Sequence, residues 1–153
     1  MNLKIDLTSF INQPHEKNYF QKIAEQTFQE VGEEKFKNKN IEISLAIVDD
    51  EEIKKQNNSL RNKNTTTDVL SIGDYSDNKN IFTELKTEDN IFLGEIILCY
   101  EFIKKSAKIS GTTIEYELSY VFSHGILHLL GYKHGEEMFS IQEKVSHNRL
   151  LDI

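Results

Sequence analysis

The stretch Ser-His-Gly-Ile-Leu-His-Leu-Leu-Gly-Tyr-Lys-His occupies residues 123–134 and holds three of the five histidines in the chain. Its first two histidines, His124 and His128, are four residues apart, so an α-helix would place both imidazoles on one face. Gly131 follows three residues later and can adopt the left-handed conformation that ends a helix. The chain then turns, and His134 arrives from outside the helix. The spacing predicts three imidazoles that converge at the end of one helix.

Three imidazoles in this arrangement are typical of a zinc site. Imidazole suits Zn²⁺, and three protein ligands leave the fourth tetrahedral position for water or substrate, which distinguishes a catalytic site from a structural one. We therefore predict that His124, His128 and His134 bind one Zn²⁺ per chain. The alternative is that they are ordinary half-buried histidines paired with backbone carbonyls, which leaves their convergence unexplained.

The spacing also resembles the zinc-peptidase helix H-E-x-x-H-x-x-G-x-x-H. Where such a peptidase has its glutamate general base, this chain has Gly125, which has no side chain to accept a proton. A peptidase would need another carboxylate, and Glu95 or Glu117 would have to reach the metal-bound water. Nothing in the sequence places them there, so a zinc metallopeptidase-like hydrolase is an alternative hypothesis.

The composition predicts a single globular domain that spans residues 1–153. The chain is 38% hydrophobic and 28% charged, and no apolar run approaches the roughly 20 residues that cross a bilayer, so we expect no membrane partner. Cys99 is the only cysteine, which excludes an intramolecular disulfide and fits a cytoplasmic location. The net charge of −7 at pH 7 argues against general affinity for nucleic acid but allows a local basic groove.

The hydrophobic pattern predicts an α+β fold. Alternating apolar residues indicate strands over residues 2–7, 41–48, 68–73 and 91–100. Apolar residues at three- and four-residue spacing indicate helices over residues 15–31, 50–58, 101–109, 113–129 and 136–151. We expect one mixed sheet of about four strands packed with about five helices, in which the histidine-bearing helix lines a cleft.

Other segments are predicted to be irregular. Residues 35–40 are expected to form a polar turn, and residues 60–67 a polar loop that contains Arg61. Residues 74–90 are polar and acidic, which favours a mobile excursion with at most a little strand around Ile81 and Phe82. His15 and His147 are interpreted as surface or packing residues.

Two blocks of the sequence resemble the YbeY-type bacterial rRNA maturation factors, a family of metal-dependent endoribonucleases. Residues 57–61, continued by residues 67–71, are similar to the family's Asn-x-x-Tyr-Arg and Thr-Asp-Val-Leu-Ser-Phe-Pro block. Residues 124–134 are similar to its H-G-x-L-H-L-x-G-Y-D-H block, and Leu-Gly-Glu-Ile at residues 93–96 stands where the family has Leu-Gly-Asp-Ile. The order of the blocks matches over the whole chain.

The chain also departs from the family pattern. Lys133 replaces the aspartate before the last histidine, Ile72-Gly73 replaces Phe-Pro, and Glu95 replaces aspartate. An aspartate at position 133 could orient a metal-bound imidazole, whereas a lysine cannot, although it could meet a phosphate. This departure bears on metal affinity and rate, while the three histidines are intact.

The resemblance implies a single-strand-specific endoribonuclease that acts in rRNA maturation (3′-end processing of the small-subunit rRNA) and in ribosome quality control. Its partners would be single-stranded rRNA and the ribosome or ribosomal proteins. A bound Zn²⁺ can polarise a phosphoryl oxygen, and a guanidinium suits the negative charge that develops on the phosphate. The candidate catalytic residues are therefore Arg61 and His124.

Residues near these two have supporting roles in this hypothesis. Lys63 and Lys133 could steer the RNA backbone, and Thr67, Asp68 and Ser71 are expected to shape the strand edge beside the cleft. Unstacked bases are expected to meet aromatic side chains there.

A third hypothesis is a non-catalytic, zinc-stabilised ribosome-associated factor, in which the metal would only fold the C-terminal turn.

Overall fold

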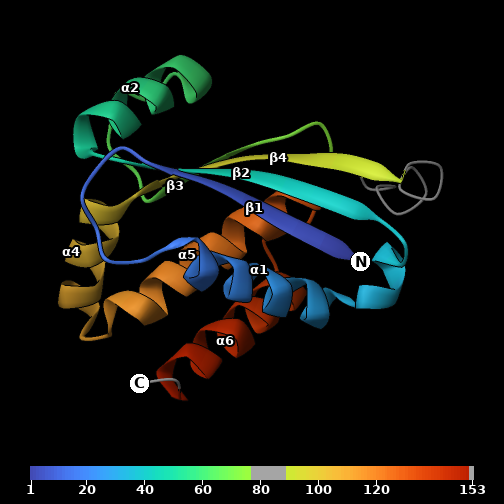
Figure 1. Ribbon diagram of the computed structural model, residues 1–153. Helices are drawn as coiled ribbons and strands as arrows, with labels where there is room; N and C mark the ends of the chain where they lie inside the picture. The colour runs from blue at the N-terminus through green and yellow to red at the C-terminus, as the bar shows by residue number, and fades with distance from the viewer. Residues whose placement is uncertain (77–88, 152–153) are drawn as a thin grey trace.

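The computed structural model describes residues 1–76 and 89–151, which form a mixed four-stranded sheet with helices on both faces (Figure 1). The elements are β1 (Asn2–Ser9), α1 (Lys17–Val31), the 3₁₀ helix η1 (Glu33–Phe36), β2 (Asn40–Val48), α2 (Asp50–Arg61), β3 (Val69–Ile72), β4 (Asn90–Cys99), α4 (Tyr100–Ser110), α5 (Ile114–Leu129) and α6 (Glu136–Leu151). The strand order is β1-β2-β4-β3; β1, β2 and β4 are parallel, and β3 pairs antiparallel with β4. The predicted α+β fold is confirmed.

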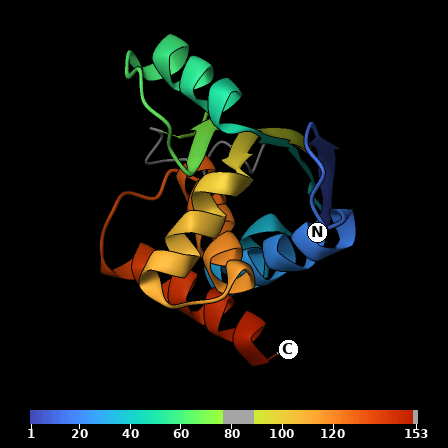
Figure 2. The same cartoon turned by 90° about the vertical axis from the view of Figure 1, so that its left-hand side faces the viewer.

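Helices α1 and α5 cover one face of the sheet, α6 packs against these two helices, and α2 lies on the other face (Figures 1 and 2). The main core fills the first face, where Phe20 of α1 meets Phe122 of α5 edge to face with ring centroids 5.5 Å apart. A smaller cluster around Ile53 of α2 and Ile97 of β4 fills the second face. None of the described helices is long and apolar enough to cross a bilayer.

Side-chain caps begin two of the helices. The Asp49 carboxylate accepts the backbone N–H of Glu52 at 2.9 Å at the start of α2. The Thr113 hydroxyl accepts the N–H of Tyr116 at 3.0 Å at the start of α5. These caps fix the residue at which each helix begins.

Helix α2 is longer than the sequence predicts. It continues to Arg61 because the next residue, Asn62, adopts the left-handed conformation (φ 56°) that ends the helix. Arg61 therefore lies in the last helical turn and not in a loop.

The turn expected over residues 35–40 begins with η1, which buries Phe36 against Phe28 with ring centroids 4.9 Å apart.

The excursion expected over residues 74–90 falls mostly outside the described residues. Residues 77–88, with the short strand expected around Ile81 and Phe82, are among those not described. Within the described part, Asn90 begins β4. Helix α6 buries Met138, Ile141 and Val145.

Strands β3 and β4 come so close at Gly73 and Gly94 that neither position has room for a side chain. A register shift between β2 and β4 leaves Gly94 with φ +150°. A Cβ atom at Gly94 would lie 2.4 Å from the carbonyl oxygen of Ile72, and one at Gly73 would lie 2.5 Å from that of Leu93. Glycine at both positions therefore sets how closely β3 approaches β4.

Replacing Gly94 should cost much more stability than replacing Gly111, another glycine of positive φ, which lies in open space. Gly94→Ala adds a clash with backbone to an unfavourable φ, whereas Gly111→Ala (φ +70°) meets nothing within 4 Å. We expect Gly111→Ala to lower the free energy of unfolding by about 1–2 kcal/mol and Gly94→Ala to lower it by clearly more. Urea denaturation measures both, and equal losses would contradict the close approach.

His15 is a packing residue, in agreement with its interpretation from the sequence. Its ring lies against Tyr19 and Tyr100, with centroids 4.5 and 5.9 Å away, and its Nε2 is 3.7 Å from a carboxylate oxygen of Glu115. Burial lowers the pKa of His15, and the attraction of Glu115 opposes that shift only in part. The folded protein therefore favours the neutral ring.

This lowered pKa predicts that part of the pH dependence of stability depends on His15. Below its ordinary pKa of 6.5 the unfolded chain binds the proton more readily than the folded chain, so stability present above pH 6.5 is lost as the pH falls. The loss of unfolding free energy between pH 7.5 and 5.5 should be smaller in His15→Gln than in the wild type. His147→Gln, at an exposed histidine, provides the control. An unchanged loss in His15→Gln would contradict the prediction.

Candidate metal centre

Helix α5 stops one residue after His128 through a turn that reverses the chain. The N–H of Gly131 donates to the carbonyl of His128 and the N–H of Tyr132 donates to that of Leu127, both at 3.0 Å, and Gly131 has φ +87°. This pair of bonds is the Schellman motif, and it confirms the predicted glycine stop. The reversal brings the following residues, His134 among them, back toward the histidine face of the helix.

The three imidazoles meet as the sequence predicts. The ring centroids of His124 and His128 are 4.4 Å apart, those of His128 and His134 are 4.9 Å apart, and those of His124 and His134 are 5.1 Å apart. One nitrogen from each ring lies within 4.8 Å of the other two. Ligand nitrogens around a tetrahedral zinc with bonds of about 2.0–2.1 Å are about 3.3 Å apart. Small ring rotations would close that difference, so the group could hold a metal ion.

The imidazoles of α5 are held in the form that a metal needs. Burial, together with the neighbouring His124 and His134, lowers the pKa of His128 to about 4. Burial also lowers the pKa of His124, against the opposing effect of a hydrogen bond to Gln142. Both rings are therefore neutral near pH 7, and no proton has to be displaced from their lone pairs.

The histidines open into a groove of about 650 Å³ between the end of α2, the β3 segment and α5. Its lining residues are Leu60, Arg61, Thr67, Asp68, Val69, Leu70, Ser71, Ile72, Gly73, Ser76, His124, His128 and His134. The predicted cleft beside the histidine helix is therefore present, and both blocks of the sequence resemblance contribute to it.

Arg61 faces this groove from the last turn of α2. It is exposed, and its positive charge contributes to the lowered pKa of His128, so its field reaches the imidazoles. Asn57, buried in the same helix, donates from its amide to the carbonyl of Thr65 at 2.9 Å and so ties down the chain after Arg61. Lys63 and Lys133 are exposed but do not line the groove, and their steering role stays a prediction.

The three residues expected to shape the strand edge, Thr67, Asp68 and Ser71, all line the groove. The Asp68 carbonyl accepts the N–H of Cys99 at 2.9 Å, which fixes this segment to the end of β4. The negative charge of the Asp68 carboxylate also acts on His124, where it opposes in part the larger lowering of the pKa by burial. Asp68 therefore influences His124 as well as lining the groove, which the sequence did not predict.

Glu95 and Glu117, the two carboxylates considered as peptidase bases, do not line the groove. Glu95 lies beside α2, on the face of the sheet opposite α5, and Glu117 lies in the first turn of α5, where it accepts the Thr112 hydroxyl at 2.7 Å. Gly125 faces the sheet, because a Cβ atom there would lie 3.2 Å from the side chain of Ile96. The metallopeptidase alternative is therefore not favoured: its proposed bases cannot reach a metal at the histidines.

Gln142 was missed in the sequence. It is completely buried on α6, its Oε1 lies 3.2 Å from Nδ1 of His124, and its amide NH₂ donates to the carbonyl of Tyr120 at 3.3 Å. A signal was present, because Gln142 occupies an inward position of α6 between the buried Ile141 and Val145. A polar residue in a core-facing stripe needs a hydrogen-bonding partner.

The described lining of the groove contains no phenylalanine or tyrosine, and the expectation that unstacked bases meet aromatic side chains there stays a prediction. Leu60 and Ile72, 46% and 40% exposed, provide the apolar surface instead. The aromatic neighbour of the cluster is Phe139 on α6, which is 42% exposed with its ring centroid 6.3 Å from that of His134.

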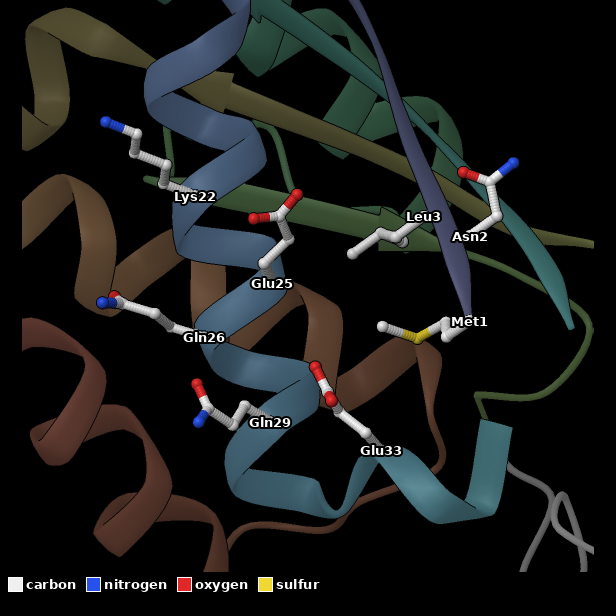
Figure 3. A pocket seen from close by; sticks show the side chains of 8 residues that line it. All are labelled: Met1, Asn2, Leu3, Lys22, Glu25, Gln26, Gln29 and Glu33. Carbon is white, nitrogen blue, oxygen red and sulfur yellow. The ribbon is translucent and has the colours of Figure 1, made fainter. Parts of the chain in front are cut away.

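A second hollow, of about 580 Å³, lies beside α1 and the start of β1 (Figure 3). Its lining residues are Met1, Asn2, Leu3, Lys22, Glu25, Gln26, Gln29 and Glu33. These residues include no histidine or cysteine, and Figure 3 shows the two carboxylates on separate turns beside polar amides. Among the described residues, the histidine groove is therefore the stronger candidate for catalysis.

Fold and site together define an α+β protein with a candidate three-histidine metal centre in an open groove. The family model of Endoribonuclease YbeY matches residues 8–149 of the chain. The chain belongs to this family.

Relatives and a solved structure agree with this assignment. An Endoribonuclease YbeY from Clostridium botulinum is 36% identical over 146 residues, which cover 88% of this chain and 85% of that protein. One from Malacoplasma penetrans is 44% identical over 105 residues, covering 69% of this chain and 64% of that protein. The solution structure of TM1509 from Thermotoga maritima shares the fold, with a TM-score of 0.61 and 24% identity over 97% of this chain and 91% of that one.

If the three imidazoles bind a metal, zinc should stabilise the folded chain. At a free Zn²⁺ concentration about 100 times the dissociation constant, the stabilisation is about 2.7 kcal/mol. Differential scanning calorimetry should show a rise in melting temperature that a chelator reverses and that His128→Ala abolishes. His147→Ala, an exposed histidine outside the cluster, should behave as the wild type. Equal stabilisation of His128→Ala would place the ion elsewhere.

Proposed function

We propose that this chain is a zinc-dependent endoribonuclease that cuts single-stranded RNA in rRNA maturation, in the cytoplasm. The observation that carries the proposal is that the three-imidazole cluster and Arg61 face one groove. Membership of a family whose model and relatives are called endoribonucleases supports RNA as the substrate. Ribosomal association belongs to the same proposal.

Zinc is the proposed ion because of the donor set. Three neutral imidazoles are typical of zinc centres that keep one position open, and the described groove residues add no thiolate. When bound, the ion supplies Lewis acidity toward a phosphoryl oxygen. His124, His128 and His134 would hold it at the floor of the groove.

Arg61 is proposed to bind the phosphodiester opposite the histidines. Its guanidinium is planar, permanently charged and able to donate two parallel hydrogen bonds to phosphate oxygens. Negative charge on these oxygens grows as the phosphodiester is attacked, so Arg61 would stabilise the transition state more than the bound substrate.

Single-stranded RNA fits the groove better than a duplex. Leu60 and Ile72 expose apolar surface along the lining, and Phe139 exposes a ring beside His134. Such surface can contact an unstacked base, whereas the bases of an A-form helix are stacked and its major groove is too narrow for side chains. Since the chain carries a net charge of −7, these local contacts have to supply much of the affinity.

The proposal is tested by incubating the protein with labelled single-stranded RNA, the matching duplex and an unstructured protein. Cleavage of the single strand should need the metal-loaded protein and should disappear with chelator or in His128→Ala. Arg61→Ala should cut about 10²–10³-fold more slowly, and Arg61→Lys should recover only part of the rate. Lys108→Ala, at an exposed lysine of α4 outside the groove lining, should keep the wild-type rate within about threefold.

Other outcomes would contradict the proposal. RNA cleavage that survives both the chelator and His128→Ala would exclude the metal centre as its source. Cleavage of the protein substrate alone would favour the peptidase. Cleavage of neither substrate, with loss of folding on chelation, would favour the non-catalytic zinc-stabilised factor.

A further inference from the structure

The inner wall of the metal centre contains a side chain with no assigned role. Gln142 on α6 is completely buried, and both ends of its amide are engaged by α5. Its Oε1 lies 3.2 Å from Nδ1 of His124, and its NH₂ donates to the carbonyl of Tyr120 at 3.3 Å. Tyr120 and His124 are one helical turn apart, so a single turn of α5 supplies both contacts.

The Tyr120 carbonyl determines which way the Gln142 amide points. A carbonyl oxygen only accepts hydrogen bonds, so the NH₂ group of Gln142 has to face it. The opposite orientation would place Oε1 against the Tyr120 carbonyl, two acceptors with no proton between them. The amide oxygen is therefore left facing Nδ1 of His124.

That oxygen in turn selects the tautomer of His124. An amide oxygen accepts and never donates, so Nδ1 of His124 has to carry the proton, and the lone pair of the neutral ring is on Nε2. We propose that Gln142 is a positioning residue that fixes His124 in the Nδ1–H tautomer and fixes its ring orientation, so that Nε2 is the metal ligand. The inference rests on the metal binding proposed above.

This arrangement differs from ordinary helix-to-helix cross-linking. A cross-link would stabilise the fold, but a positioning contact also makes the ring a better ligand before any ion arrives. Outer partners of this kind typically change metal affinity by about 10–100-fold when they are removed. Gln142→Met keeps the side-chain length but removes the acceptor, and Gln142→Glu keeps the acceptor for His124.

The test measures the His124 tautomer and zinc affinity separately. In metal-free, ¹⁵N-labelled protein, long-range ¹H–¹⁵N correlation NMR should show His124 protonated at Nδ1 in the wild type, and a growing Nε2–H form in Gln142→Met. Competition with a chromophoric chelator should show zinc binding about 10–100-fold weaker in Gln142→Met. Gln142→Glu, which keeps the acceptor for His124 but loses the donor to Tyr120, should bind zinc more tightly than Gln142→Met. Ser146→Ala removes a buried α6 hydroxyl that donates to the backbone carbonyl of Gln142 and not to His124. This variant should bind zinc as the wild type does.

The possible failures are distinguishable. A wild-type His124 protonated at Nε2 overturns the inference without any variant. The inference is also overturned if Gln142→Met binds zinc as tightly as the wild type, or if zinc affinity falls equally in Gln142→Met and Ser146→Ala. Either result leaves the proposed function intact. A wild type that binds no zinc overturns the proposed metal centre and the role of Gln142 with it.

Discussion

The site depends on the point at which α5 ends. His124 and His128 share a helix face wherever the helix goes, but His134 can join them only if the chain reverses soon after His128. The Schellman turn at Gly131 makes that reversal through two backbone hydrogen bonds, and glycine is suited to its left-handed conformation. One local backbone motif thus converts a pair of helical histidines into a three-ligand cluster.

The groove depends on how closely the sheet and α5 approach one another. Gly125 allows α5 to lie against Ile96 of β4. The histidines of α5 therefore line the same groove as the residues of β3. The paired glycines Gly73 and Gly94 bring β3 against β4 and fix the opposite wall. The family block that contains Arg61 is thereby placed across from the histidine block, although more than sixty residues separate them in the chain.

The cluster of imidazoles was predictable because its information is local. A four-residue spacing and a helix-ending glycine are visible in twelve consecutive residues, and strand and helix periodicity gave the α+β fold in the same way. Gln142 and Asp68 were not assigned their places beside His124 because those contacts join residues far apart in sequence. The end of α2 was missed because it is set by the left-handed conformation of Asn62, a residue type that also suits an ordinary loop.

The central claim is that three imidazoles bind one divalent ion and leave a coordination position open. X-ray absorption at the zinc edge of the loaded protein measures this directly. The account predicts three imidazole nitrogens at about 2.0–2.1 Å and one further light ligand from solvent. A sulfur ligand at about 2.3 Å, or a fourth ligand from the protein, would contradict it.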